Sequence, residues 1–301
     1  MELVARGSEY LIEFKTTVSI VMCVRNVEKF IDDCLRSILN QTFNDFELLV
    51  IDDLSNDQTR QKIEMFNDKR IRFYRNEEWL GIAKSRNKAL NLARGEYVFF
   101  TDGDCVLTRN WIKIGLGNFK DRNCVGVEGK TCYVSEEYRP TRSDAVTENK
   151  KGGKFMTCNI AYKKSVLEKI GGFDERFVYF DDRDLALRAQ KFGRICFNPE
   201  MMVFHRQITL SPGQFVKHCR RIRDQVYLYK KFKDKSLFMW RIISPLNLIV
   251  IMFPPLVFGG LLHGTYKKKA DFALLPFVYV RYICERLNFW DMCIKERVFL
   301  I

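Results

Sequence analysis

TVSIVMCV, residues 17–24, is the stretch that decides the fold, together with the two segments that follow it, EKFIDDCLRSILNQ (28–41) and FELLVIDD (46–53). The first segment is β-branched and almost wholly apolar, as is typical of a strand covered on both faces. In the second, Ile31, Leu35 and Ile38 share one stripe of a helix. The third is another buried strand, and it ends in acidic residues. A strand, a helix and a strand in this order predict an α/β fold.

The same alternation continues along the chain. IRFYRN (71–76) and YVFFTDGD (97–104) read as further strands, and GIAKSRNKALNLARG (81–95) as a helix that stops at a glycine. Alternating strands and helices predict a mostly parallel sheet, whose ligands gather at the carboxyl ends of the strands. Polar residues stand at those ends: Arg25–Asn26, Asp52–Asp53 and Asp102–Asp104.

Composition narrows the class of protein. The chain has 301 residues, of which 47% are hydrophobic and 29% charged, and this balance indicates a globular protein. Its net charge of +13 predicts an anionic partner, either nucleic acid, nucleotide phosphates or an anionic membrane surface. The ten cysteines are scattered without a CxxC pair, so we expect a reduced, intracellular chain without a zinc site.

The chain changes character near residue 214, so we predict a catalytic domain over 1–213 and a second region over 214–301. QFVKHCRRIRDQVYLYKKF (214–232) is a basic amphipathic helix by its spacing. Its apolar face consists of Phe215, Cys219, Ile222, Val226 and Tyr229. Residues 217–241 contain nine basic and two acidic side chains.

Residues 242–262 carry no charge over 21 positions, a length that could span a bilayer. Prolines and an asparagine interrupt this segment, and basic residues flank both of its ends. We therefore expect an apolar helical hairpin, with 272–280 as its second limb, at the cytoplasmic face of the cell membrane. The alternative is a helical pair packed on the soluble domain. Nucleic acid is a weaker partner, because the basic residues alternate with a membrane-like segment.

Asp102 and Asp104 follow the fourth strand and are separated by one glycine. Two carboxylates this close indicate a cation between them, a shared proton or an exposed turn. Mn²⁺ or Mg²⁺ would suit such a pair, because these ions take few carboxylates and complete their shell with water and substrate phosphates. The segment also resembles the strand of haloacid-dehalogenase-type phosphatases, in which Asp102 would be the nucleophile and Asp104 the acid/base.

The order of several motifs over residues 17 to 206 resembles that of the family 2 inverting glycosyltransferases of GT-A fold. The opening unit up to VIDDLSNDQT looks like the nucleotide-binding half of the family, and GIAKSRNKAL like its helix start. YVFFTDGD is similar to its DxD strand, GGFDERF to its acceptor-side turn and FDDRDLALRAQKFG to its catalytic segment. The resemblance implies a GT-A, Rossmann-like sheet flanked by helices, and sugar transfer from a nucleotide-diphosphate sugar.

The resemblance also implies the site residues. Asp53 would contact the nucleotide base beside Cys23 and Arg25, and Lys84 and Arg86 would meet the diphosphate. Asp102 would contact ribose or metal-bound water. These donor-binding residues all stand at strand or helix ends.

The metal and catalytic residues follow from the same resemblance. Asp104, with Asp102 and His205, would hold Mn²⁺ or Mg²⁺. Asp182 aligns with the general base, which takes the proton of the acceptor hydroxyl, and Asp181 precedes it where the family commonly has Glu.

We expect roles for four further side chains. Asn159 would face the donor or acceptor sugar. Trp79 would either cover the acceptor or fill the core, and the core is the expected place. Asp184 and Arg188 would orient the catalytic helix.

The sequence thus predicts a metal-dependent inverting transferase. It uses a UDP-sugar or GDP-mannose and acts on a glycan or a polyprenyl- or dolichyl-linked acceptor near a membrane. A phosphatase and a non-catalytic sugar-nucleotide-binding protein are the alternatives.

Overall fold

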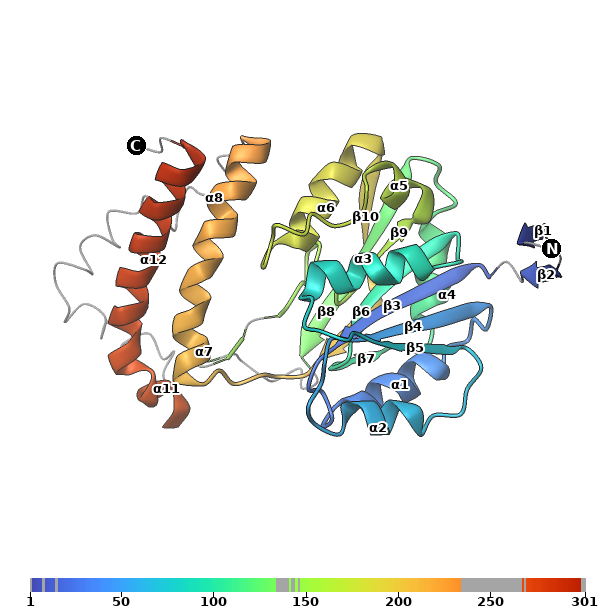
Figure 1. Cartoon of the computed structure of the whole chain (residues 1–301), viewed down its shortest axis with the longest axis horizontal. Coiled ribbons are helices and arrows are strands. Elements are labelled where there is room, and N and C mark those ends of the chain that lie inside the picture. Colours follow the sequence, from blue (N-terminus) through green and yellow to red (C-terminus); the bar gives the residue numbers. More distant parts are fainter. Residues whose placement is uncertain are drawn as a thin grey trace. The chain divides into compact units, whose positions relative to one another are not determined.

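The computed structural model describes residues 2–6, 9–13, 16–133, 141, 144, 145, 147–233, 267 and 269–298 (Figure 1). The chain forms two compact units. The first consists of Met1–Val134, Thr147–Arg176 and Asp181–Arg206. The second consists of Ser135–Val146, Phe177–Phe180 and Gln207–Ile301. The predicted domain boundary after residue 213 stays a prediction.

The first unit is built on an eight-stranded sheet of order β5-β4-β3-β6-β9-β8-β10-β7. Its strands are β3 (Val18–Val24), β4 (Phe46–Asp52), β5 (Ile71–Arg75), β6 (Tyr97–Asp102), β7 (Cys105–Leu107), β8 (Cys124–Tyr133), β9 (Ile160–Lys163) and β10 (Arg194–His205). A separate antiparallel pair, β1 (Glu2–Arg6) and β2 (Glu9–Glu13), precedes them. The four strands predicted from the sequence are confirmed as β3, β4, β5 and β6.

The directions of the strands determine where their carboxyl ends lie. β5, β4, β3 and β6 are mutually parallel, β9 runs antiparallel to β6 and β8, and β10 is parallel to β8. The carboxyl ends of β3, β4, β6, β8 and β10 therefore share one edge of the sheet. β7 is antiparallel to β10, so its first residue lies at that same edge. The mixed α/β architecture that the sequence predicts is confirmed.

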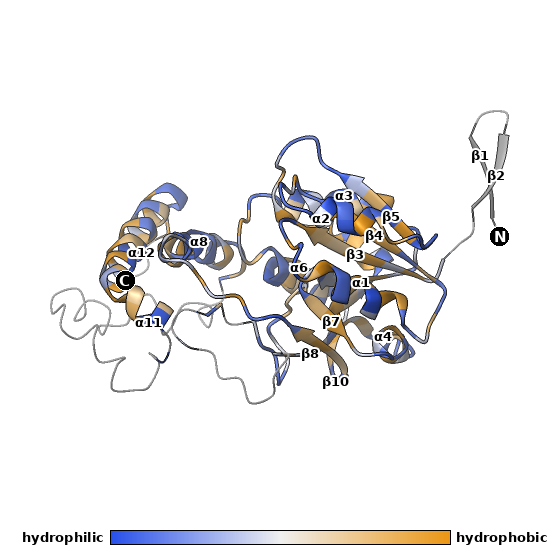
Figure 2. Ribbon diagram, turned by 90° about the horizontal axis from the view of Figure 1, so that it is seen from below, coloured by the Kyte–Doolittle hydropathy of each residue, from blue (hydrophilic) through white to orange (hydrophobic). Residues whose placement is uncertain are grey.

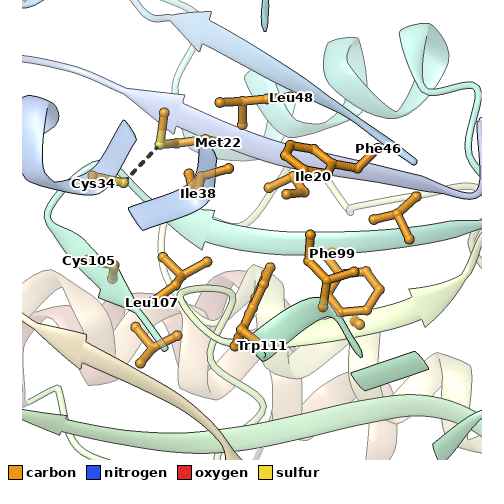
Figure 3. Close-up of a cluster of buried hydrophobic side chains, with 14 of the residues drawn as sticks. Ile20, Met22, Cys34, Ile38, Phe46, Leu48, Phe99, Cys105, Leu107 and Trp111 are labelled. Carbon is orange, nitrogen blue, oxygen red and sulfur yellow. Dashed lines mark hydrogen bonds between the residues drawn. The ribbon is translucent and has the colours of Figure 1, made fainter. Parts of the chain in front are cut away.

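Helices cover both faces of this sheet (Figure 1). They are α1 (Ile31–Leu39), α2 (Thr59–Glu64), α3 (Ile82–Leu92), α4 (Trp111–Asn118), α5 (Lys164–Lys169) and α6 (Asp181–Ala189), the last followed by the short η1 (Gln190–Phe192). The predicted stripe of α1 is fully buried. Figure 3 shows part of the core on that face, where Ile20 and Phe99 of the sheet lie near Ile38 of α1 and Trp111 of α4. A second core cluster lies against α3, α5 and α6.

The second unit contains α7 (Pro212–Lys217), η2 (His218–Arg220), α8 (Arg221–Phe232), α11 (Lys269–Ala273) and α12 (Leu275–Glu296). The predicted amphipathic helix is thus interrupted by one short 3-10 turn, and its apolar face is buried except at Tyr229, which is half-buried. Residues 242–262 lie outside the described residues, and 272–280 fall in α11 and α12. Among the helices that are described, none has both the length and the apolar character needed to cross a bilayer.

Candidate functional site

The site lies at the edge of the first unit where β3, β4, β6 and β10 end. Cys23, Asp53, Asp102 and His205 stand at or directly after these strand ends. Asp104 follows β6 by two residues and directly precedes β7. The pairing of β7 with β10 places Cys105 opposite His205, so residues about 100 positions apart in the sequence meet here.

Asp53 fixes the loop in front of α3. Its carboxylate is 6% exposed and accepts hydrogen bonds from the Asn76 side chain and from the backbone N–H groups of Leu80 and Gly81, each at 2.9 Å. Gly81 has φ 84°, a left-handed conformation that favours glycine. The acidic end of β4 therefore sets the position at which α3 begins, and with it the first turn that faces the edge.

The residue before Leu80 is a tryptophan whose side chain is open to solvent. Trp79 is 63% exposed, and the Arg25 guanidinium carbon lies 5.5 Å from its ring centroid. The expectation that Trp79 fills the core is wrong, because its loop runs over the surface towards Gly81. Near this pair, burial raises the pKa of the Cys23 thiol to about 12, so Cys23 is a neutral group.

Lys84 and Arg86 differ although they are two residues apart on α3. Lys84 is exposed on the first turn. Arg86 is 7% exposed, and its guanidinium lies 2.6 Å from the Asp181 carboxylate and 3.7 Å from that of Asp102. Burial opposes its charge, but the two carboxylates outweigh burial and raise its pKa. Arg86 therefore ties the end of β6 to the start of α6 rather than facing solvent.

The two aspartates at the start of α6 have different surroundings. Asp181 is 4% exposed and is neutralised by Arg86. Asp182 is half-buried, and its Oδ1 accepts a hydrogen bond from the Arg183 backbone N–H at 2.7 Å. Burial, and then the charge of Asp181, raise the pKa of Asp182 to about 7. A carboxylate with this pKa can accept a proton near neutral pH.

Two residues that support α6 behave as expected. Asp184 is fully buried and pairs with Arg188 at 2.7 Å, four residues later on the same helix. Arg188 also donates to the Ile170 carbonyl at 2.7 Å. The structural role predicted for this pair is confirmed.

Asp104 and His205 face each other across the edge. The Nε2 of His205 lies 3.5 Å from an Asp104 carboxylate oxygen, and both residues are under a tenth exposed. The His205 Nδ1 lies 2.7 Å from the carbonyl oxygen of Arg206. A carbonyl only accepts, so Nδ1 carries the proton and the Nε2 of neutral histidine presents a lone pair towards the carboxylate.

These two groups fit a divalent cation. Within the described part of the chain, the group whose ligand atoms lie within 4.8 Å of one another is Asp104, Cys105 and His205. A carboxylate and an imidazole suit Mn²⁺, and the bond from Nδ1 to a carbonyl is the outer-shell contact that such a histidine usually has. Burial raises the pKa of the Cys105 thiol, so the neutral thiol is the weaker donor. Asp102 is not in this group, because its carboxylate lies towards Arg86.

Asn159 does not present a polar group to a ligand in this structure. It is 1% exposed, its oxygen accepts from the Trp111 indole at 2.8 Å, and its nitrogen donates to the carbonyls of Lys130 and Met201 at 2.8 and 3.0 Å. These hydrogen bonds hold β8, β10 and α4 together. Asn159 is therefore not part of the proposed sugar site.

The exposure of Trp79 and the position of Cys105 were not predicted from the sequence. Tryptophan is a large apolar residue and so favours burial, and no periodic pattern marks Trp79 as an exposed loop residue. Cys105 directly follows Asp104, but its approach to His205 depends on the pairing of β7 with β10, which no local pattern predicts.

Comparison with models of protein families shows which family this chain matches. The model of the family described as Glycosyl transferase family 2 matches residues 19–172 of this chain. That range includes β4 to β9, all of β3 except its first residue, and the residues at the ends of β3, β4 and β6.

Two curated relatives match most of the chain. One is the UDP-Glc:alpha-D-GlcNAc-diphosphoundecaprenol beta-1,3-glucosyltransferase WfgD of Escherichia coli, 32% identical over 78% of this chain and 92% of its own length. The other is an uncharacterized glycosyltransferase of Haemophilus influenzae, 37% identical over 88% of this chain and 85% of its own length.

A solved structure shares the fold. The mannosyltransferase PcManGT from Pyrobaculum calidifontis, in complex with GDP-Man and Mn²⁺, superposes with a TM-score of 0.62 at 17% identity. The superposition covers 92% of this chain and 88% of that one. At this identity the likeness establishes the GT-A fold and nothing about the ligand.

Proposed function

Because this chain belongs to glycosyl transferase family 2, we propose that it moves a sugar from a nucleotide-diphosphate sugar to a lipid-linked glycan acceptor with inversion at the anomeric carbon. The donor is a UDP-sugar or GDP-mannose, and the reaction is a single displacement without a covalent enzyme intermediate. Asp182 is the general base.

The observation that carries the proposal is the electrostatic arrangement at the sheet edge. Arg86 pairs with Asp181 and Asp102 and thereby joins the start of α6 to the end of β6. Asp182 is not in either of these ion pairs, and its pKa is raised to about 7. The edge thus combines a carboxylate able to accept a proton with a separate Asp104–His205 pair suited to a divalent cation.

The residues then have separate tasks. Asp182 takes the proton of the acceptor hydroxyl as that oxygen attacks the anomeric carbon. Asp104 and His205 would hold Mn²⁺ or Mg²⁺, which supplies positive charge for the leaving diphosphate. Lys84, exposed on the first turn of α3, adds its own charge there. Asp181 does not take part in proton transfer. Its ion pair with Arg86 holds the start of α6 in position.

The nucleotide is proposed to bind over Asp53, Cys23 and Arg25. Trp79 extends this surface, because its exposed ring beside Arg25 can stack on a base. Asp102, whose side chain is 32% exposed, is proposed to contact the ribose. Changing Trp79 to Ala should therefore raise the KM for the donor and leave kcat nearly unchanged.

The acceptor class comes from the relatives. WfgD is named for a GlcNAc-diphosphoundecaprenol acceptor, and this chain covers 92% of WfgD. We propose an acceptor of the same class, a sugar on a polyprenyl diphosphate, and a place of action at the cytoplasmic face of the cell membrane.

A thermal-shift panel tests the donor site. UDP, GDP, ADP and CDP are each added with and without Mn²⁺, because a ligand that binds the folded state raises the melting temperature. We expect UDP or GDP to stabilise the protein, more strongly with Mn²⁺, and Asp104→Asn to lose only the Mn²⁺ increment. A chain that no nucleotide stabilises would contradict the proposal.

Two other functions remain distinguishable. A phosphatase would hydrolyse a generic phosphoester and depend on Asp102, which here lies beside Arg86. A non-catalytic nucleotide-sugar-binding protein would be unaffected by Asp182→Asn. The transferase should bind nucleotide normally with that substitution and lose transfer.

A further inference from the structure

One side of α12 is apolar and open to solvent. Val280, Ile283, Leu287, Trp290 and Ile294 follow one another at intervals of three and four residues, so they lie along a single side of the helix. We call these five residues the apolar stripe. Ile283 is half-buried, and the other four are 44%, 57%, 53% and 78% exposed. The stripe is about 21 Å long at 1.5 Å per residue.

The stripe is not the face by which α12 packs in its own unit. That face contains Val278 and Phe289, which are 1% and 5% exposed. Val278 lies in a cluster with Phe215 of α7, and Phe289 in a cluster with Val226 of α8. Figure 1 shows α12 beside α8, and Figure 2 shows apolar residues along it. Within the described residues, the stripe belongs to neither cluster.

A continuous exposed apolar surface on a helix indicates a partner. For a packed helix of a water-exposed unit, the side opposite the core is expected to be polar. Here it contains a tryptophan and four aliphatic residues, a composition typical of helices that lie in a membrane interface. A tryptophan ring suits that boundary because it is apolar with one polar N–H.

The charge around the stripe selects the partner. Residues 207–301 contain 16 Lys and Arg against six Asp and Glu, so they hold +10 of the chain's net charge of +13. Exposed cations in this unit include Arg220, Lys230 and Lys295. A second copy of the unit would have the same charge and be repelled, whereas anionic lipid is attracted. Nucleic acid would match the charge but not the apolar side chains.

We propose that α12 docks on an anionic membrane, with the apolar stripe in the boundary between headgroups and acyl chains. The inference rests on the proposed function in so far as a lipid-linked acceptor requires the enzyme at a membrane. The neighbouring sequence agrees, because the uncharged residues 242–262 precede α11 by a short basic segment.

Vesicle flotation of the full chain tests this surface. The wild type is expected to float with vesicles of phosphatidylglycerol and phosphatidylcholine, and less with phosphatidylcholine alone or at high salt. The double variant Leu287→Glu/Ile294→Glu should weaken binding at least about tenfold, because two large side chains no longer enter the apolar boundary. Met65→Glu is the matched control, since Met65 is 82% exposed in the first unit, and it should float as the wild type does.

Trp290 gives a direct readout of contact with lipid. Vesicles with brominated acyl chains should quench the fluorescence of the wild type more than that of Trp290→Phe, a change that keeps the site apolar. Equal quenching of the two proteins would overturn the proposal.

The remaining outcomes separate the alternatives. Full flotation of the double variant overturns the proposal, as does a dimer that the double variant dissociates while neither protein binds vesicles. The nucleotide thermal shift of the double variant reports its fold and should equal that of the wild type. If vesicle binding depends on the stripe but no nucleotide stabilises the chain, the surface stands and the proposed function fails.

Discussion

At the scale of single residues, the carboxyl groups of the site differ in charge state and pKa because their neighbours differ. Asp181 is neutralised by the buried Arg86. Asp182, next to it, has a pKa raised to about 7, chiefly by burial. Burial also raises the pKa of Asp104 to about 6. Adjacent aspartates thus have different chemistry in one fold, and this selects Asp182 as the proposed base.

The pH dependence of transfer follows from Asp182. The general base must be deprotonated, so kcat should rise tenfold per pH unit below about pH 7 and level off above it. The measurement is kcat between pH 5 and 9 at saturating donor, acceptor and Mn²⁺. A kcat that is flat from pH 5 upwards would exclude Asp182 as the titrating base.

Stability should change with pH in the opposite sense. A raised carboxyl pKa favours the protonated folded state, so the contribution of Asp182 is full below about pH 4 and is lost as the pH rises through about 7. Asp182→Asn should therefore be more stable than the wild type above pH 7, by on the order of 2 kcal/mol, and similar at low pH. Urea unfolding at pH 5 and 8 measures this difference, and equal differences at both values would count against the assigned pKa.

Arg86 should contribute more to the free energy of unfolding than to binding of the nucleotide diphosphate. Arg86→Ala leaves Asp181 and Asp102 without their shared cation, which should cost about 3 kcal/mol. Lys84→Ala on the same helix is the control. Lys84 is exposed, so its loss should change unfolding by less than about 0.5 kcal/mol while it weakens nucleotide-diphosphate binding. Equal destabilisation by the two substitutions would contradict the structural role of Arg86.

At the scale of elements, α3 connects the parts of the site. Arg86 binds the start of α6, and the neighbouring Asn87 binds the turn that follows α5. The Asn87 amide accepts from the Phe173 N–H at 2.8 Å and donates to the Phe173 carbonyl at 2.9 Å. Asp53 fixes the start of α3 through Leu80 and Gly81. One helix thus sets the relative positions of the nucleotide and catalytic residues.

Two adjacent glycines test this connection. Gly171 and Gly172 both have left-handed φ values, 73° and 68°, so alanine is strained at either position. A Cβ on Gly172 would lie 2.6 Å from the Asn87 side-chain oxygen, whereas one on Gly171 would meet nothing within 4 Å. Gly172→Ala should therefore destabilise by about 1–2 kcal/mol more than Gly171→Ala. Chemical denaturation of both variants measures the difference, and identical losses would show that the Asn87 contact is unimportant.

The elements themselves were largely predictable, because periodicity and burial agree along β3, α1, β4 and β6. Local patterns could not predict the contacts of side chains that depend on loops and strands remote in the sequence. Arg86 reads as an exposed helix residue, yet it is buried because Asp181, 95 positions later, offers a counter-charge. Asn159 reads as a polar pocket residue, yet it serves the core. Both depend on contacts between segments that are remote in the sequence.

At the scale of the whole molecule, the chain combines a GT-A sheet with a strongly basic helical unit. The first unit contains every proposed catalytic and donor-binding residue. Residues 207–301, which form most of the second unit, contain +10 of the net charge and the apolar stripe of α12. We infer a division of work in which one unit performs the chemistry and the other meets the membrane in which the acceptor is anchored.

The configuration of the product tests the central claim most directly. The protein is incubated with Mn²⁺, an α-linked nucleotide sugar labelled with ¹³C at the anomeric carbon, and GlcNAc-diphosphoundecaprenol in phosphatidylglycerol vesicles. The donor is the one whose nucleotide gives the largest thermal shift, and the one-bond carbon–hydrogen coupling reports the new linkage. We predict a β-linked product from the wild type and none from Asp182→Asn. An α-linked product, or transfer by Asp182→Asn at the wild-type rate, would contradict the account.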